Sequence, residues 1–237
     1  MESNTLLSVR NVSNIYTDRR FGPLGKREKK SVLNNVNMEI KKGEIFGLAG
    51  KSGCGKTTLA RCILGLTYFS GEILFNSKEI LFNSKKEIET TSGIQMVFQD
   101  PGASLNPVKK IGWLVEEPLH IHKIGTKQER SQRTDEILFK VGLDPSYKTR
   151  HVHELSGGQK QRVCIGRALI LNPQLLIADE AISSLDVSAG AQILNLFMEL
   201  HQNSNLDILF ISHNKDAVQY LCDRIAVMEK GQIEDIY

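Results

Sequence analysis

A glycine-rich segment, Gly50-Lys51-Ser52-Gly53-Cys54-Gly55-Lys56-Thr57, matches the pattern G-x-x-x-x-G-K-S/T. Glycines let consecutive backbone N–H groups curve around a polyphosphate without clashes from a Cβ atom. In this pattern Lys56 is expected to reach the β- and γ-phosphates of a nucleotide, and the hydroxyl of Thr57 is expected to bind Mg²⁺. The segment follows an apolar run, residues 45–49, and precedes a helical pattern, as a phosphate-binding loop requires. The sequence therefore predicts a site for ATP and Mg²⁺, whose remaining contacts come from Lys51, Ser52, Gly53, Cys54, Gly55 and Thr58.

Two acidic residues, Asp179 and Glu180, follow a second apolar run at residues 175–178. A strand there would deliver both carboxylates at its carboxyl end, where ligands bind in open α/β sheets. We expect Asp179 to hold Mg²⁺, mostly through water, and Glu180 to polarise the attacking water as a general base, a contribution of ~10²–10⁴-fold in rate. The alternative interpretation is that both acids only solvate the end of a strand.

A third segment, Leu155-Ser156-Gly157-Gly158-Gln159, begins another helical pattern. A serine followed by two glycines at a helix start exposes backbone donors suited to an anion, although the same residues could be no more than a helix cap. LSGGQ followed by an apolar strand that ends in Asp-Glu resembles the ATP-binding cassette (ABC) ATPases. The resemblance implies that Ser156, Gly157, Gly158 and Gln159 bind the γ-phosphate of an ATP held by a second subunit.

The resemblance extends to four further positions. Gln99 lies where ABC ATPases carry a glutamine that touches Mg²⁺ and the attacking water, and His213 matches a histidine that contacts the γ-phosphate. Asp186 ends a Ser-Leu-Asp motif through which two subunits sense each other. Tyr16 lies where the family carries an aromatic residue that stacks on adenine, although Ile15 or the following loop could shift this register. The family pattern usually has Pro-Thr after Asp-Glu, where this chain has Ala-Ile, a change that removes no catalytic group.

The predicted fold class is α/β. Short apolar runs at residues 45–49, 175–178, 208–211 and 225–228 alternate with helical patterns at 57–66, 127–141 and 158–171. This alternation predicts a parallel sheet covered on both faces. The resemblance implies a P-loop NTPase (RecA-like) core, a peripheral antiparallel β subdomain and an inserted helical subdomain at about residues 103–155. The whole chain, residues 1–237, is then one ABC ATPase domain.

Composition limits the possible partners. The net charge of +3 among 24% charged residues makes no electrostatic case for nucleic-acid binding. Four widely separated cysteines without a C-x-x-C pair indicate free thiols in a reducing compartment. No apolar run approaches the roughly 18 residues that span a bilayer, and the amino-terminal residues lack a signal-peptide pattern. If the protein works at a membrane, we expect another subunit to cross it.

Two regions indicate a subgroup of the family. Residues 100–107 and Glu117-Pro118-Leu119 resemble the dipeptide, oligopeptide and nickel importers, and residues 162–164 and 179–186 favour the nickel or metal-chelate branch. The resemblance implies an ATP-hydrolysing subunit on the cytoplasmic side of the membrane. Its expected partners are a similar ATPase subunit, two permease subunits and a solute-binding protein; the pair of ATPases is a heterodimer in the importer, with a homodimer possible in isolation. A regulatory or translation-associated ABC protein is the alternative. A DNA-repair or chromosome-structuring ABC ATPase would need a long insertion between Gln99 and Ser156, and that interval is too short.

Two local features are unusual. The heptapeptide Glu-Ile-Leu-Phe-Asn-Ser-Lys occurs at residues 72–78 and again at 79–85. Because strand side chains alternate with period two, the two copies cannot serve one core face in a single straight strand, and we interpret them as a peripheral hairpin. A basic segment at residues 19–30 is interpreted as a solvated loop, with attraction to anionic lipid headgroups as the alternative.

Overall fold

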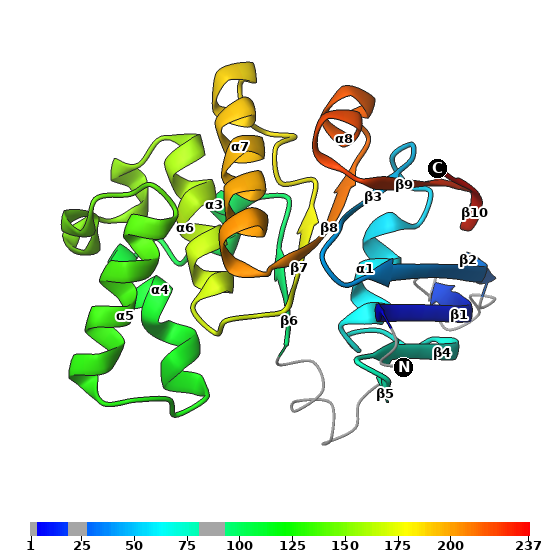
Figure 1. The fold of residues 1–237 in the computed structure, drawn as a ribbon, viewed down its shortest axis with the longest axis horizontal. Helices are drawn as coiled ribbons and strands as arrows, with labels where there is room; N and C mark the ends of the chain where they lie inside the picture. Colours follow the sequence, from blue (N-terminus) through cyan, green and yellow to red (C-terminus); the bar gives the residue numbers. More distant parts are fainter. Residues whose placement is uncertain (1–3, 19–27, 81–92) are drawn as a thin grey trace, which may run out of the picture. The chain divides into compact units, whose positions relative to one another are not determined.

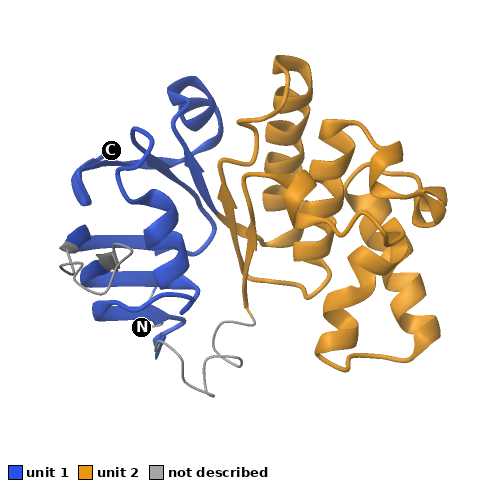
Figure 2. Ribbon diagram, turned by 180° about the vertical axis from the view of Figure 1, so that it is seen from behind, with its two compact units in different colours: residues 1–92, 209–237 blue, residues 93–208 orange. Residues whose placement is uncertain are grey.

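The computed structural model describes residues 4–18, 28–80 and 93–237. The chain forms two compact units: Met1–Ser92 together with Leu209–Tyr237, called unit 1, and Gly93–Ile208, called unit 2 (Figure 2). Most of the basic segment and most of the second heptapeptide copy lie outside the described residues.

Unit 1 contains an antiparallel sheet with the strand order β2-β1-β4-β5 (Figure 1). Its strands are β1 (Thr5–Asp18), β2 (Glu28–Lys41), β4 (Ser70–Phe75) and β5 (Lys78–Glu79). Leu7 and Val9 of β1 are buried and lie opposite Ile40 and Met38 of β2. This sheet is the antiparallel β part that the sequence predicted.

The repeated heptapeptide folds back on itself between β4 and β5. Asn76 and Ser77 have φ values of 50° and 63°, as a two-residue hairpin turn requires. The N–H of Ile80 donates to the carbonyl of Ile73 over 2.8 Å, and both side chains are buried. The turn reverses the chain, so Ile73 of the first copy and Ile80 of the second meet across the hairpin, which explains how both isoleucines reach the core.

Unit 1 also contains the strands that carry the phosphate loop. The fully buried strand β3 (Ile45–Ala49) pairs in parallel with β9 (Arg224–Glu229), and β9 pairs antiparallel with β10 (Gln232–Ile236). Helix α1 (Lys56–Ile63) follows the loop. The buried strand β8 (Asp207–Ser212) passes from unit 2 into unit 1 and leads to helix α8 (Lys215–Leu221).

Unit 2 contains the parallel strands β6 (Ile94–Val97) and β7 (Leu175–Asp179) and most of the helices. Helices α3 (Pro101–Ser104), α4 (Ile111–Ile121) and α5 (Lys127–Lys140) are followed by the 3₁₀ turns η1 (Pro145–Thr149) and η2 (Val152–Glu154). Helices α6 (Gly157–Leu169) and α7 (Val187–Ser204) complete the unit. The predicted helices and strands are confirmed to within three residues at their ends, and the interval 103–155 is mainly helical.

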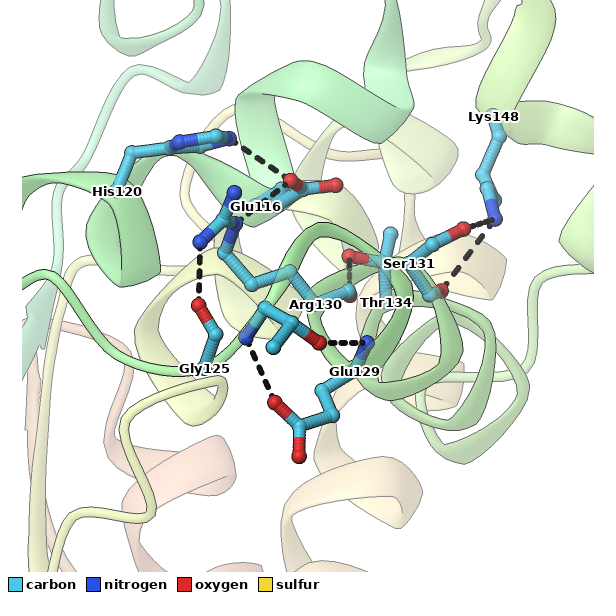
Figure 3. A network of polar contacts seen from close by, with 9 residues as sticks. Glu116, His120, Gly125, Glu129, Arg130, Ser131, Thr134 and Lys148 are labelled. Atoms are coloured by element: carbon cyan, nitrogen blue, oxygen red, sulfur yellow. Dashed lines mark hydrogen bonds and ion pairs between the residues drawn. The ribbon is translucent and has the colours of Figure 1, made fainter.

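A polar network joins α4, α5 and η1 (Figure 3). The Oε1 of Glu116 on α4 lies 3.2 Å from Nε of Arg130 on α5 and 2.8 Å from Nε2 of His120. The Nζ of Lys148 in η1 donates to Oγ of Ser131 on α5 over 3.0 Å. These contacts hold the helices of this interval together. Among the described residues, no helix is long and apolar enough to cross a membrane.

Candidate functional site

The phosphate loop connects β3 to α1 in unit 1. Gly53 and Gly55 have φ values of 79° and 117°, which L-residues with a Cβ rarely adopt. A Cβ placed on Gly50 would lie 2.4 Å from the carbonyl oxygen of Met228. The glycines of the pattern are therefore required by the backbone conformation and by the close approach of β9.

Lys56 lies beneath the loop, with only 6% of its surface exposed. Its Nζ donates to the carbonyl oxygens of Gly50 over 2.7 Å and Lys51 over 3.2 Å. Thr57 and Thr58 occupy the first turn of α1. The N–H groups of a first turn point toward the helix start and have no hydrogen-bond acceptor within the helix. That turn has no acidic residue, so its donors, its dipole and the ammonium group fit the phosphates of ATP.

A cavity of about 550 Å³ lies beside this loop within unit 1. Lys51, Ser52 and Cys54 of the loop line it together with His213, which follows β8. Lys215, the first residue of α8, also lines it and was not among the sequence candidates, because a single lysine at a helix start carries no motif. The structure thus brings the predicted histidine and the loop to one cavity.

Tyr16 does not line that cavity. It lies on β1 opposite Lys30 of β2, and 63% of the surface of this residue is exposed. Its assignment as the adenine-stacking residue stays a prediction.

The predicted catalytic acids lie at the carboxyl end of β7 in unit 2. Asp179 is the last residue of this strand, and both Asp179 and Glu180 are buried. Strand β6 runs parallel to β7 with Val97 opposite Ala178, so Gln99, two residues past β6, leaves the sheet at the same edge. The structure brings Gln99, Asp179 and Glu180 to one edge of this strand pair, where carboxylate and amide oxygens suit Mg²⁺.

The backbone of Glu180 is in the left-handed region, with a φ of 52°. Among the described residues, five of the other non-glycine residues in this region are asparagines, which tolerate it, whereas a glutamate there costs of order 1–3 kcal/mol, a strain of the kind that clusters at functional sites. The N–H and hydroxyl of Ser183 both donate to the carbonyl of Glu180, over 3.1 and 2.9 Å. These bonds close the turn at the place where the family pattern usually has a proline.

The LSGGQ segment, residues 155–159, starts helix α6. Ser156 is the N-cap, and its Oγ and the side chain of Gln159 form a capping box. Cβ atoms on Gly157 and Gly158 would lie 3.4 Å from Leu185 and 3.3 Å from Ala189, so glycine permits α7 and the loop before it to approach closely.

Asp186 caps α7 by accepting a hydrogen bond from the N–H of Ala189 over 2.8 Å. A second cavity, of about 500 Å³, is lined by the predicted site residues Ser156, Gly158, Gln159 and Asp186. Other residues also line it, among them Tyr147 and Arg162, which were not predicted as site residues. The structure therefore gathers the LSGGQ segment and Asp186 around one hollow in unit 2.

The site residues fall into two groups. The phosphate loop and His213 belong to unit 1, and the acids, Gln99, the LSGGQ segment and Asp186 belong to unit 2. A phosphate loop after a parallel strand, carboxylates at the end of another and a serine–glycine helix start define a nucleotide-binding cassette, the ABC ATPase class of P-loop NTPases.

The comparisons with known proteins agree with this class. Residues 33–183 match the family model described as ABC transporter. The chain is 42% identical over 98% of its length to the oligopeptide transport ATP-binding protein AppF of Bacillus subtilis, covering 71% of that protein. It is 45% identical over 86% of its length to the protein OppF of the same organism, covering 68% of it. The chain belongs to the ABC transporter family and is an ATPase of that family.

Two solved structures have the same fold. CbiO1 of Clostridium perfringens, part of the transporter complex CbiONQ, superposes with a TM-score of 0.85 at 29% identity, covering 99% of this chain and 88% of CbiO1. The ATP-binding cassette MJ0796, a dimer bound to ADP and Pi, gives a TM-score of 0.81 at 29% identity, covering 98% and 97% of the two chains. The predicted P-loop NTPase fold of the ABC type is confirmed.

Proposed function

We propose that this chain is the ATP-hydrolysing subunit of an ABC importer for oligopeptides. One observation carries the proposal: the chain contains a cradle for phosphates in unit 1 and an exposed serine–glycine helix start in unit 2. AppF and OppF are named as oligopeptide transport ATP-binding proteins, which supports a peptide rather than nickel as the transported solute. The same names favour transport over a regulatory or translation-associated role.

In the proposed reaction, ATP lies between the phosphate loop of one cassette and the LSGGQ segment of a second. Lys56 and the first turn of α1 bind the phosphates, and His213 contacts the γ-phosphate. Glu180 accepts a proton from the attacking water, which Gln99 helps to orient. Thr57, Asp179 and Gln99 would hold Mg²⁺, which reduces the negative charge on the phosphates when it is bound. Asp186, beside the LSGGQ segment, faces the second cassette. Loss of the γ-phosphate weakens the contact between cassettes and releases them.

The proposed assembly places two cassettes on the cytoplasmic side of the membrane. The second cassette is a similar chain, two permease subunits cross the membrane, and a solute-binding protein delivers the peptide. The helices of the interval 103–155 pass the movement of the cassettes to the permeases.

Replacement of Glu180 tests the assigned chemistry. Glu180→Gln keeps the size and hydrogen-bonding capacity of the side chain but cannot accept the proton, so kcat should fall by ~10²–10⁴-fold while ATP binding persists. Turnover is measured by phosphate release, and binding by a fluorescent ATP analogue. Glu199→Gln, an exposed glutamate on α7, is the matched control and should leave both unchanged. Normal turnover by Glu180→Gln would refute the role of the base.

The transported solute is tested in cells that carry the complete importer. Uptake of a labelled oligopeptide and of Ni²⁺ is compared between the parent chain and Glu180→Gln. Loss of peptide uptake alone supports the proposal, and loss of nickel uptake alone would assign the chain to the nickel branch.

A further inference from the structure

The amide of Gln159, the last residue of the LSGGQ segment, is held at both of its polar atoms. Its Oε1 accepts a hydrogen bond from the backbone N–H of Ser156 over 2.9 Å. Its Nε2 donates to the hydroxyl oxygen of Tyr147 over 3.0 Å. Its backbone N–H donates to Oγ of Ser156 over 3.3 Å. Gln159 thus holds the segment in shape from within its own chain.

These bonds determine which donors the helix start can offer to a phosphate. The N–H groups of Ser156 and Gln159 are both used inside the capping box. The backbone donors of the first turn that remain are those of Gly157 and Gly158, and the Ser156 hydroxyl can still donate while its oxygen accepts. Ser156 and Gly157 are exposed. The orientation of these groups depends on the box and therefore on the conformation of Gln159.

Tyr147 provides the second anchor for Gln159. A glutamine has three side-chain torsions, the last with a broad preference, so a single hydrogen bond leaves its amide free to swing. The tyrosine lies twelve residues before Gln159 and lines the same cavity. Its hydroxyl is the contact that stops this motion.

Tyr147 is itself fixed in place. The guanidinium of Arg150 lies 3.9 Å from the centre of its ring. The next residue, Lys148, donates to Oγ of Ser131 on α5, as Figure 3 shows, and its Nζ lies 2.9 Å from a carboxylate oxygen of Asp135. The hydroxyl of Tyr147 is therefore presented from a segment that is bound to α5.

We propose that Tyr147 is a positioning residue for the LSGGQ segment: it holds Gln159 so that Gly157, Gly158 and Ser156 present their donors to a phosphate bound by a second cassette. This inference rests on the proposed function, because that phosphate belongs to the shared ATP. Tyr147 acts only through Gln159. Its loss should weaken the association of two cassettes without altering how either cassette binds ATP through its own phosphate loop.

Tyr147→Phe removes the hydroxyl and keeps the ring beside Arg150. ATP-dependent association is measured by analytical ultracentrifugation, both for the chain alone and for its ATPase pair from the purified importer. Glu180→Gln is present in all chains and slows turnover by ~10²–10⁴-fold. We expect Tyr147→Phe to weaken association roughly two- to tenfold, the range for loss of one hydrogen bond. ATP binding by the unassociated chain should be unchanged. Tyr68→Phe, an exposed tyrosine of unit 1, should have no effect.

A double-mutant cycle separates positioning through Gln159 from a general structural effect. Gln159→Met removes the amide at similar length, and in this background Tyr147→Phe should cause no further weakening. Gln132→Met is the control for the glutamine replacement, because it removes an exposed side-chain amide on α5 together with its hydrogen bond to Glu136. Unchanged association of Tyr147→Phe, or effects of the two replacements that simply add, would overturn the positioning role alone. If the Glu180→Gln parent fails to associate with ATP in both preparations, the shared site itself is refuted, and the role of Tyr147 with it.

Discussion

Gln161 has a side-chain amide that is buried in the interior of unit 2. We predict that its replacement changes the free energy of unfolding. The residue lies on α6 and has no exposed surface. Neither its Nε2 nor its Oε1 has a hydrogen-bond partner among the described residues. Such a group loses its hydrogen bonds to water on folding and regains none, which costs about 1–3 kcal/mol.

Gln161→Met should therefore stabilise the protein. Methionine has a similar length and flexibility, a similar helix propensity and no strongly polar atom. We expect the free energy of unfolding to rise by about 1–3 kcal/mol, which corresponds to roughly 2–12 °C in Tm for a chain of this size. Urea denaturation followed by circular dichroism measures the change, as a higher midpoint with an unchanged slope.

The control is Gln132→Met on the exposed surface of α5, which removes no buried polar group and should shift the midpoint little. An unchanged or lower midpoint for Gln161→Met would show that the amide is satisfied in the folded protein, and would refute the reasoning. A change of slope would instead point to altered compactness of one of the two states.

Two further predictions concern the phosphate loop and the buried thiols. Gly55→Ala places a Cβ 3.0 Å from the carbonyl of Val32 at a φ of 117°, so it should lower the unfolding midpoint and weaken ATP-analogue binding at least tenfold; wild-type binding would contradict the steric argument. Burial raises the pKa of Cys62, Cys164 and Cys222 from 9.0 to about 12, so the unfolded chain loses these protons first and stability should fall as the pH rises from about 9 toward 12. Under reducing conditions the unfolding free energies of the parent and of Cys62→Ala are compared across this range; the parent should lose more stability, and parallel curves would count against burial as the cause.

Much of the fold could be predicted because its signals are local. Strand β3 and the phosphate loop follow one another without a gap, so an apolar run, glycines and a lysine at fixed spacing suffice to find them. Helix α5 begins at a capping box and ends before Gly142, whose φ is 72°, and both signals lie within the helix and its neighbours.

Tyr147 could not be found in the same way. It contacts Gln159 only because η1 folds back toward the start of α6, and no spacing rule connects a tyrosine to a glutamine twelve residues later. Lys215 was missed for a related reason, since its place beside the phosphate loop depends on how α8 packs in unit 1.

From the sequence alone we predict the chemistry proposed for this protein: which residues bind phosphate, which carboxylates act on water, and which family they resemble. The folded chain adds three facts that no motif carries: the backbone of Glu180 is left-handed, Gln161 is buried within a polar stretch, and Gln159 donates a hydrogen bond to Tyr147. The two kinds of feature depend on residues at different separations along the sequence. Motif chemistry depends on neighbours along the chain, whereas burial, backbone strain and side-chain pairing depend on atoms that packing brings together from distant positions.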